Sequence, residues 1–381
     1  MRGRIVAVGA IAAAVVLAAG CGASSNGGTG ASNSSPSSST NAAAAPSWLT
    51  AAQTAANTAT QIPSTIADQS LGAFKPKAHG KLYVVDCDLS LEGCSQISNA
   101  FGQAAKAIGY SITQCNGGSS ATAPAQCFTN AVNAHPSAII VNGIDAQESG
   151  GGFAAAQKAK IPIIGSFTGD TLPTAGVASE VAGTACEQEG KLLGDWVIAD
   201  SKGKANAMFV GTQTYNCNVQ RLQGFQEAFS ACTTCTLKSI QFSIADLTTT
   251  LPAQITSAIE ANPSVNYIAG TFDQVALDAT TAVRNQGKAS SIKVVGFDGN
   301  APNLQLVKAG NIQVADIVTG QQDSGWEGVD AAARIYSGMK VPDDIPPSMV
   351  LVTQQNIAQI GAQFNGATGY EEQFKTLWGL G

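Results

Sequence analysis

The chain is poor in the side chains that most enzymes and metal sites use. It contains two histidines, His79 and His135, nine cysteines, 26 Asp and Glu residues and 20 Lys and Arg residues, for a net charge of −6. Two histidines argue against zinc sites and histidine-dependent catalysis, so we expect no metal and no cofactor. The acidic balance and the lack of a basic patch argue against nucleic-acid binding.

Polar and aromatic side chains instead recur directly after apolar stretches of the chain. Carboxylates accept hydroxyl protons, an arginine donates in a fixed fork and aromatic rings cover an apolar face, which suits a small polyhydroxyl or otherwise polar ligand. Helix capping is the alternative role at each position, although we favour ligand contact for Arg221 and Asp298. The candidate ligand-binding residues are Asp88, Ser90, Phe167, Thr168, Tyr215, Arg221, Phe272, Asp273, Asp298, Thr319 and Gln321.

The elements that must position these side chains alternate regularly from Lys81 onward. Strands are predicted at 81–86, 110–114, 137–142, 161–165 and 175–178, and in a second series at 205–211, 237–243, 265–269, 291–297 and 312–318. Helices are predicted at 95–108, 121–133, 149–158, 183–199, 216–230, 251–261 and 273–286. Continuous apolar strands that alternate with helices predict parallel sheets covered on both faces.

The two series resemble each other. Residues 131–141 (AVNAHPSAIIV) and 258–268 (AIEANPSVNYI) both predict a helix end, then Pro-Ser, then a strand. The doubled pattern predicts an α/β fold of two Rossmann-like lobes. Because ligands bind beyond the carboxyl ends of parallel strands, two such lobes form a cleft that can close by hinge motion.

The N-terminus has the pattern of an export signal. Arg2 and Arg4 precede a short apolar stretch that ends in Leu-Ala-Ala-Gly-Cys21, which resembles the lipobox of bacterial lipoproteins. We therefore expect a signal peptide over 1–20, an acylated Cys21, and a flexible tether and lead-in over 21–78, with a short helix near 48–56. A plain secretory signal is the alternative. Either way, the folded part is expected outside the cytoplasm, and the lipid would hold it on the outer face of the cell membrane.

The remaining cysteines agree with that location. Their number is even, and disulfides are stable in exported proteins. Sequential pairing is the favoured hypothesis for Cys87–Cys94, Cys115–Cys127, Cys186–Cys217 and Cys232–Cys235. The Cys-Thr-Thr-Cys spacing of the last pair also suits a redox or zinc motif, although no second such motif and no nearby histidine support it.

Enzyme motifs are incomplete. Residues 183–191 are spaced too widely for a phosphate-binding P-loop, and residues 165–169 have Phe where a nucleophile elbow needs Ser. A Ser-His-Asp site would need His79, which lies in the lead-in, or His135, which lies at a helix end. We therefore expect no enzymatic activity.

Residues 80–360 resemble the ribose-type (type I) periplasmic substrate-binding proteins of ABC importers. The matching stretches are Arg221-Leu-Gln-Gly-Phe225, Phe272-Asp-Gln-Val-Ala-Leu277, Val294-Val-Gly-Phe-Asp298-Gly, 328–341 and Leu351-Val-Thr. The lipobox and tether resemble those of actinobacterial members. The resemblance implies a three-strand hinge with crossings near 178, 319 and 346. The N-terminal lobe would then be 79–178 plus 320–345, and the C-terminal lobe 179–319 plus 346–381.

The resemblance also implies site roles. The family's guanidinium and carboxylate ligands fall on Arg221 and Asp298, and its amide at an interdomain crossing falls on Thr319, with Gln321 nearby as a substitute. Other sugar-reading positions differ from the family and fall on Gly93, Cys94, Phe167, Thr168 and Phe272. A sugar or polyol is the expected ligand, and a less polar or aromatic solute is the alternative.

The resemblance implies partners as well. An ABC permease and its ATPase subunits would take up the ligand, and the chain is expected to be a monomer that performs no covalent chemistry. A surface receptor that reports its ligand to a membrane sensor is the alternative function, because it would use the same closing cleft. Related repressors carry an N-terminal DNA-binding helix pair where this chain has its signal and tether.

Overall fold

We describe a computed structural model of the chain, which covers residues 45–118, 120, 122–170 and 176–381. The expected signal peptide, Cys21 and the tether up to residue 44 lie outside these described residues. Among the helices of the described part, none has the length and apolar character needed to cross a membrane.

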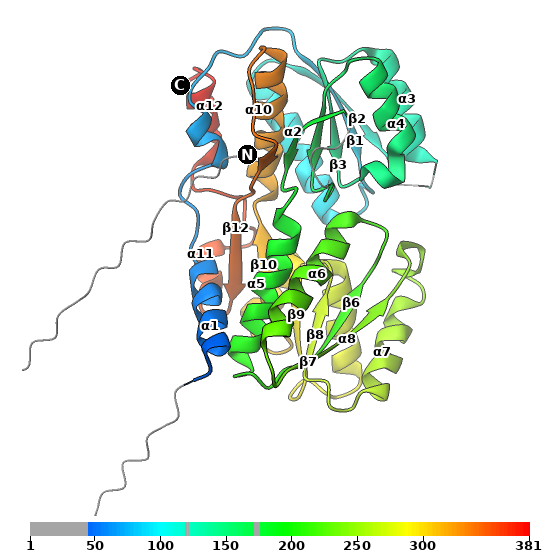
Figure 1. The fold of residues 1–381 in the computed structure, drawn as a ribbon, viewed down its shortest axis with the longest axis vertical. Helices are drawn as coiled ribbons and strands as arrows, with labels where there is room; N and C mark the ends of the chain where they lie inside the picture. The colour runs from blue at the N-terminus through cyan, green and yellow to red at the C-terminus, as the bar shows by residue number, and fades with distance from the viewer. Residues whose placement is uncertain (1–44, 119, 121, 171–175) are drawn as a thin grey trace, which may run out of the picture. The chain divides into compact units, whose positions relative to one another are not determined.

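Two six-stranded sheets form the centres of two lobes (Figure 1). In the first lobe the strand order is β11-β5-β4-β3-β1-β2, and every pair of neighbours is parallel. Its strands are β1 (Lys81–Asp86), β2 (Ser111–Asn116), β3 (Ala138–Asn142), β4 (Ile163–Ser166), β5 (Val177–Val181) and β11 (Asp344–Ile345).

The second lobe repeats this order as β12-β10-β9-β8-β6-β7. It is parallel except for β12, which runs antiparallel to β10. Its strands are β6 (Asn206–Gly211), β7 (Thr236–Gln241), β8 (Tyr267–Gly270), β9 (Lys293–Asp298), β10 (Gln313–Thr319) and β12 (Met349–Thr353). The repeat noted in the sequence includes β3 and β8, which hold equivalent places in the two sheets.

Helices cover both faces of each sheet. The first lobe carries η1 (Ala67–Leu71), α2 (Glu92–Ala107), α3 (Ala123–Ala134), α4 (Ala146–Lys158), α10 (Gln321–Tyr336) and α12 (Tyr370–Leu377). The second carries α1 (Ser47–Ala59), α5 (Ala185–Asp200), α6 (Asn216–Ala231), η2 (Ile244–Asp246), α7 (Leu251–Ala261), α8 (Asp273–Asn285), α9 (Ala301–Ala309) and α11 (Ile357–Ile360).

Strand β1 shows why the apolar runs are continuous. Leu82 and Val84 pack into the cluster formed with α2 and α10, whereas Tyr83 and Val85 pack into the cluster formed with α3 and α4. Side chains of successive strand residues point to opposite faces, so a strand covered on both sides needs apolar residues throughout. The predicted α/β alternation, parallel sheets and two lobes are confirmed.

The crossings between the lobes need two corrections. Strand β5 pairs with β4, so the first crossing follows Val181 and does not lie near 178. The C-terminal lobe was expected to include all of 346–381, but Phe374 and Trp378 pack on Trp326 of α10. The apolar face of α12 packs in the core of the first lobe, so residues from about Ala367 onward belong to that lobe.

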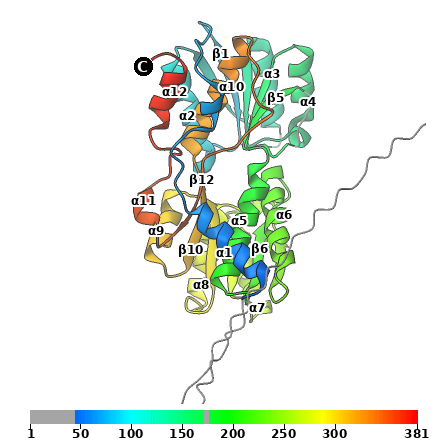
Figure 2. The same ribbon diagram turned by 60° about the vertical axis from the view of Figure 1, so that its left-hand side comes forward.

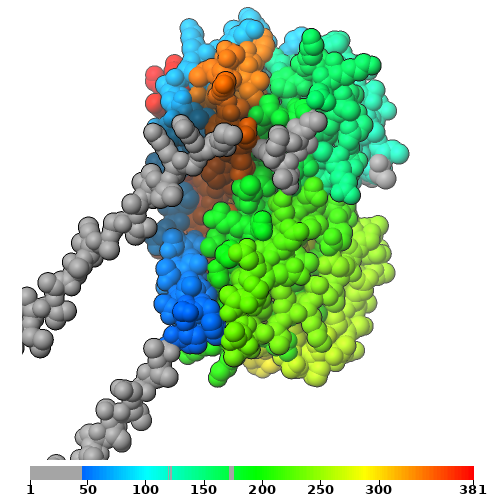
Figure 3. Space-filling model, viewed as in Figure 1, coloured from blue at the N-terminus to red at the C-terminus, as the bar shows by residue number. Residues whose placement is uncertain are grey.

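The lead-in is also more than a spacer. The predicted helix near 48–56 is α1, which lies beside α5 on the second lobe (Figures 2 and 3). Its Leu49, Ala52 and Ala56 pack in the core of that lobe. The chain then passes to the first lobe before η1, where its backbone accepts a hydrogen bond from Thr368 at Pro63. The chain therefore crosses between the lobes twice more than the three expected times, once between α1 and η1 and once shortly before Ala367.

All four expected disulfides are present. They join Cys87 to Cys94, Cys115 to Cys127, Cys186 to Cys217, and Cys232 to Cys235. The sequential pairing hypothesis is confirmed, and the closely spaced Cys232 and Cys235 form a disulfide rather than a metal site.

Candidate ligand-binding site

A cavity of about 340 Å³ lies between the two lobes, at the carboxyl ends of their strands. Most of the predicted ligand residues line it, and they come from both lobes. These are Ser90, Phe167, Tyr215, Arg221, Phe272, Asp298, Thr319 and Gln321. The carboxyl ends of the parallel strands meet at this cavity, so residues that directly follow strands come together although they lie far apart in the sequence. We call this expectation the strand-end rule.

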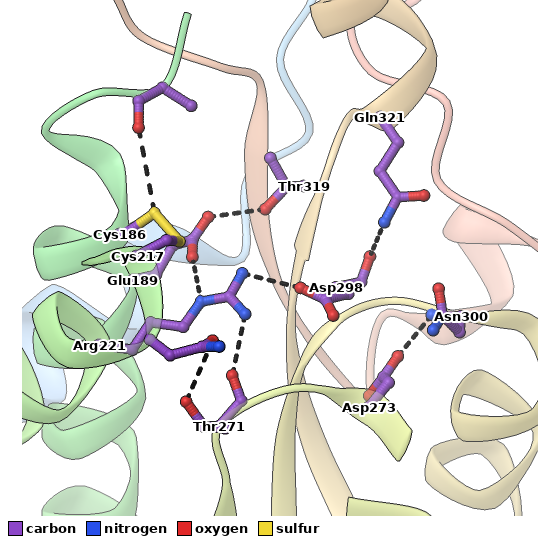
Figure 4. A network of polar contacts seen from close by, with 12 residues as sticks. Cys186, Glu189, Cys217, Arg221, Thr271, Asp273, Asp298, Asn300, Thr319 and Gln321 are labelled. Atoms are coloured by element: carbon purple, nitrogen blue, oxygen red, sulfur yellow. Dashed lines mark hydrogen bonds and ion pairs between the residues drawn. A yellow bond between two sulfur atoms is a disulfide. The ribbon is translucent and has the colours of Figure 1, made fainter. Parts of the chain in front are cut away.

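Arg221 of α6 is at the centre of the polar network on the cavity wall (Figure 4). Its Nη2 donates to Asp298 Oδ1 at 2.7 Å, and its Nη1 donates to the carbonyl oxygen of Thr271 at 2.9 Å. Its Nε donates to Glu189 Oε2 at 2.8 Å. An arginine has five N–H groups, so each Nη retains one that is available to a ligand.

Glu189 is the partner that the sequence did not reveal. Its side chain is fully buried, and its second oxygen accepts a hydrogen bond from Thr319 Oγ1 at 2.8 Å. Glu189 therefore holds the side chains of both Arg221 and Thr319 in position. It lies in the middle of a helix rather than after a strand, so the strand-end rule could not find it.

The helices that carry this pair approach very closely. A Cβ atom on Gly190 of α5 would lie 2.0 Å from the carbonyl oxygen of Arg221, and one on Gly224 of α6 would lie 1.8 Å from that of Glu187. One turn away, the Cys186–Cys217 disulfide joins the first turns of the same two helices. The close helix contact at these glycines and the disulfide together set the distance between the Glu189 and Arg221 side chains.

The charge of Arg221 is stabilised from two sides. Burial by itself lowers the pKa of an arginine, but the Asp298 and Glu189 carboxylates outweigh it and raise the pKa of Arg221 above its ordinary value. The guanidinium also lies over the ring of Phe297, 4.8 Å from its centroid. Arg221 is therefore a permanently charged and rigidly held donor.

Two cavity residues have unusual backbone conformations. Asp298 has φ of 99° and Phe167 has φ of 53°, in the left-handed region that side chains other than glycine rarely adopt. Such strain persists only where surrounding contacts impose it, and it is concentrated at functional sites. Here the Asp298 side chain remains 20% exposed, on the cavity wall beside Arg221.

Three predicted residues do not line the cavity. Asp88 Oδ1 accepts a hydrogen bond from Ser90 N, Thr168 Oγ1 accepts one from Asp170 N, and buried Asp273 accepts one from Asn300 N. These oxygens are used to satisfy turn and helix-start N–H groups. Asp88 and Thr168 therefore make turn contacts within the chain, Asp273 contacts the start of a neighbouring helix, and the cavity lining gives no support for the ligand role expected at these three positions.

Several cavity residues were missed, and five of them have amide side chains. Asn142 ends β3 and follows the same strand-end rule, so it could have been predicted. Asn218, Gln274, Asn300 and Asn303 lie on helices or a connecting turn, where no sequence signal distinguishes them.

The two lobes touch at the edges of the cavity. Leu91 of the first lobe packs with Phe272 against the apolar core of the second. On another edge, Asn216 N donates to Asp145 Oδ2 at 3.3 Å, and Gln220 Nε2 donates to the carbonyl oxygen of Gly169 at 2.8 Å. These contacts join the two lobes beside the cavity, and both lobes contribute residues to its wall.

Three carboxylates act on Tyr215, one of the residues that line the cavity. Burial, followed by the charges of Glu148, Asp88 and Asp145, raises the pKa of Tyr215 to about 12. Burial and then the charge of Asp145 raise the pKa of Glu148 to about 7.

One group of described side chains has spacing that could suit a metal ion, namely Cys186, Glu189 and Cys217. Its two sulfur atoms form a disulfide, and both Glu189 oxygens accept hydrogen bonds from protein groups. Disulfide sulfur atoms are not thiolate ligands, so this group does not fit a metal site.

Fold and cavity together define a two-lobed binding protein of the periplasmic type. The chain belongs to the periplasmic binding protein domain family, whose model matches residues 88–340. It is similar to the ribose import binding protein RbsB of Salmonella typhimurium, with 30% identity over 220 residues that cover 57% of this chain and 71% of the relative. It is 32% identical over 108 residues, or 27% of this chain and 33% of the other, to the D-allose-binding periplasmic protein of Escherichia coli. These relatives are solute-binding proteins and not enzymes.

Solved structures share the fold at low identity. A glucose-galactose binding protein from Geobacillus stearothermophilus superposes with a TM-score of 0.65 at 20% identity, covering 74% of this chain and 99% of its own. An ABC transporter solute binding protein from Mycobacterium smegmatis, solved with bound glycerol, gives a TM-score of 0.68 at 18% identity, covering 76% and 99%. The family match confirms the expected resemblance to periplasmic binding proteins, and the solved structures confirm the fold.

Proposed function

We propose that this protein captures a small sugar or polyol outside the cytoplasm and delivers it to an ABC importer. The observation that carries the proposal is the pairing of Arg221 with Asp298 on the wall of the cavity between the lobes. Each Nη of Arg221 keeps one N–H that has no protein partner, and the Asp298 side chain is partly exposed. One ligand hydroxyl can therefore donate to the Asp298 carboxylate while another accepts from the Arg221 guanidinium.

Binding would depend on closure of the lobes. In this structure the cavity wall combines Ser90, Phe167 and Gln321 of the first lobe with Arg221 and Asp298 of the second. A ligand that contacts both lobes stabilises this arrangement over any more open one. The permease partner would then recognise the closed form.

The proposal includes attachment to the membrane through acylated Cys21. Its support is the sequence pattern of residues 1–21, which lie outside the described residues. Mass spectrometry of the protein purified from its native membrane tests this part. The expected result is a mature N-terminus at Cys21 that carries acyl chains, and an unmodified Cys21 contradicts it.

Transport is tested by deletion of the gene. The expected result is loss of high-affinity uptake of a radiolabelled sugar or polyol that raises the melting temperature of the purified protein, because a ligand that binds the native state stabilises it. Complementation with the Arg221→Ala/Asp298→Ala variant should fail to restore uptake. Uptake that is unchanged by the deletion contradicts the transport role.

A further inference from the structure

One set of contacts joins the two lobes without lining the cavity. From the first lobe it includes Asp145, which precedes α4, and Gly169 and Asp170, which lie in the loop after β4. From the second lobe it includes Asn216 and Gln220 of α6. None of these five residues lines the cavity, so any effect they have on ligand binding must act through the arrangement of the lobes.

The N-termini of two helices share a carboxylate in this set. Asp145 is the N-cap of α4, and its Oδ1 accepts a hydrogen bond from Glu148 N at 2.8 Å. The N-cap of α6, Tyr215, makes no side-chain cap of its own. Instead, Asn216 N of α6 donates across the lobes to Asp145 Oδ2 at 3.3 Å. One carboxylate therefore accepts from the first turns of two helices that belong to different lobes.

A second carboxylate has the same double role. Asp170 accepts hydrogen bonds from Ala146 N of α4, at 3.2 Å to Oδ1 and 3.0 Å to Oδ2, and from Asn216 Nδ2 of α6 at 3.4 Å. Asp145 and Asp170 are both buried. Because the N-terminus of a helix carries a partial positive charge, these carboxylates stabilise both helix ends at once. Separation of the lobes would remove both acceptors from α6.

The two backbones approach most closely at Gly169. Its carbonyl oxygen accepts a hydrogen bond from Gln220 Nε2 at 2.8 Å. A Cβ atom on Gly169 would lie 2.6 Å from the backbone nitrogen of Cys217 and 2.9 Å from the carbonyl carbon of Asn216. No side chain fits at those distances from backbone atoms, so glycine is required for the lobes to lie this close.

Both sides of this contact are held within their own lobes. Cys217, in the first turn of α6, is bonded to Cys186 of α5. In the facing loop, Asp170 N donates to Thr168 Oγ1 at 3.1 Å. Phe167 begins that loop and lines the cavity. The loop 167–170 therefore connects the cavity wall of the first lobe with the contact on α6.

We infer that Asp145, Gly169 and Asp170 form a latch that holds α6, and with it the second lobe, against the first lobe and thereby sets the affinity for ligand. This inference rests on the proposed function and adds positioning residues that do not touch the ligand. The apparent affinity of a ligand that contacts both lobes rises with the population in which the lobes lie together. A change in the latch should therefore alter affinity although the cavity wall keeps its side chains.

Gly169→Ala tests the latch by steric exclusion. Calorimetric titration of the mature wild-type protein with D-ribose, D-allose, D-glucose, myo-inositol and glycerol first identifies the probe that binds most tightly. Gly169→Ala should bind this probe at least about tenfold more weakly, because its Cβ would meet the backbone of α6. Gly109→Ala is the matched control, since Gly109 has a similar φ of 75° and its Cβ would meet nothing within 4 Å. Its Kd should stay within about twofold of that of wild type.

Gln220→Ala tests the latch from the second lobe. It removes the hydrogen bond to Gly169 and should weaken binding about fivefold, the effect of one hydrogen bond. Gln223→Ala, at an exposed position of the same helix, should stay within about twofold of wild type. Because Gly169→Ala already prevents the contact, Gly169→Ala/Gln220→Ala should bind no more weakly than Gly169→Ala alone.

Small-angle X-ray scattering with saturating probe separates a latch from a local defect of the cavity wall. The radius of gyration of the Gly169→Ala complex should exceed that of the wild-type and Gly109→Ala complexes, because the lobes of this variant cannot approach as closely. A wall defect at Phe167 would weaken binding and leave the radius of gyration unchanged.

The outcomes separate the latch from the proposed function. Equal affinities of Gly169→Ala and Gly109→Ala, or equal radii of gyration of the Gly169→Ala and wild-type complexes, overturn the latch and leave ligand binding by wild type intact. If Gly169→Ala does not fold, equal affinities of Gln220→Ala and Gln223→Ala overturn it. The absence of binding of all five probes to wild type overturns the proposed function, and the inference fails with it.

Discussion

Removing the positive charge of Arg221 should reduce the stability of the protein as well as its affinity for ligand. In Arg221→Met, Glu189 remains in the core with a fully buried side chain and no cation. Breaking one partner out of a buried ion pair typically costs about 3–5 kcal/mol. Thr319 still donates to Glu189 at 2.8 Å, and Asp298 is partly exposed, so we expect about 3 kcal/mol, the low end of that range.

Urea unfolding of the ligand-free protein measures this loss, and the chain provides a matched control. Lys191 and Glu227 form an ion pair between the same two helices, but their side chains are 43% and 55% exposed. Lys191→Met should therefore change the free energy of unfolding by at most about 1 kcal/mol. In Arg221→Met/Glu189→Gln, where neither charge is left, most of the lost stability should return.

The result that refutes this reasoning is a loss in Arg221→Met no larger than the loss in Lys191→Met. It would mean that Glu189 is hydrated, or neutralised by some other group, and that the pair does not hold the site rigidly. Affinity measured on the same variants then separates the two roles. Glu189→Gln keeps Arg221 paired with Asp298, so any loss of affinity in that variant reports on positioning alone.

Three further predictions concern the supports of the site. Cys186→Ser/Cys217→Ser should lower the free energy of unfolding by about 2–4 kcal/mol and also weaken ligand binding, because the disulfide closes a 31-residue loop beside the charged pair. Gly224→Ala should destabilise the protein by at least about 1–3 kcal/mol, because its Cβ would lie 1.8 Å from a backbone oxygen of the facing helix. Burial, the largest cause, raises the pKa of Glu180 from 4.5 to about 8, so its contribution to stability is complete below pH 4.5 and is lost as the pH rises through 8. Wild type measured against Glu180→Gln by urea unfolding should therefore lose relative stability across that interval.

Each of these has a control and a contradicting result. Cys232→Ser/Cys235→Ser removes a disulfide that spans three residues and lies outside the cavity, and it should leave affinity unchanged. Gly102→Ala, whose Cβ would meet nothing within 4 Å, should be neutral or stabilising. Equal affinity losses in the two disulfide variants, equal stabilities in the two glycine variants, or a pH-independent difference for Glu180 would each contradict the physical reason given.

The fold could be predicted from the sequence because its strands and helices have different apolar periods. Continuous runs such as Ile139–Val141 indicate strands buried on both faces, and the doubled pattern indicates two lobes. The end of the chain could not be placed in this way. The apolar residues of α12 fit a surface helix on either lobe, and the packing of Phe374 and Trp378 on Trp326 decides between them.

The site was predictable where its residues follow strands. Asp298 and Thr319 end their strands on the cavity wall, and Asn142 obeys the same rule. Glu189 could not be predicted, because its role depends on the close approach of α5 and α6 at two glycines, which no local sequence pattern shows. Asp273 follows its strand in the same way but does not line the cavity, and its carboxylate accepts a hydrogen bond from the backbone N–H of Asn300.

The central claim, that one small polyol is held between the lobes at Arg221 and Asp298, is tested most directly by a crystal structure of the complex. The crystals would contain the neutral sugar or polyol that binds most tightly in calorimetry. We expect its density in the cavity, with one hydroxyl donating to Asp298 and another accepting from Arg221. Density on the outer surface, or in the cavity without contact to either residue, would contradict the account.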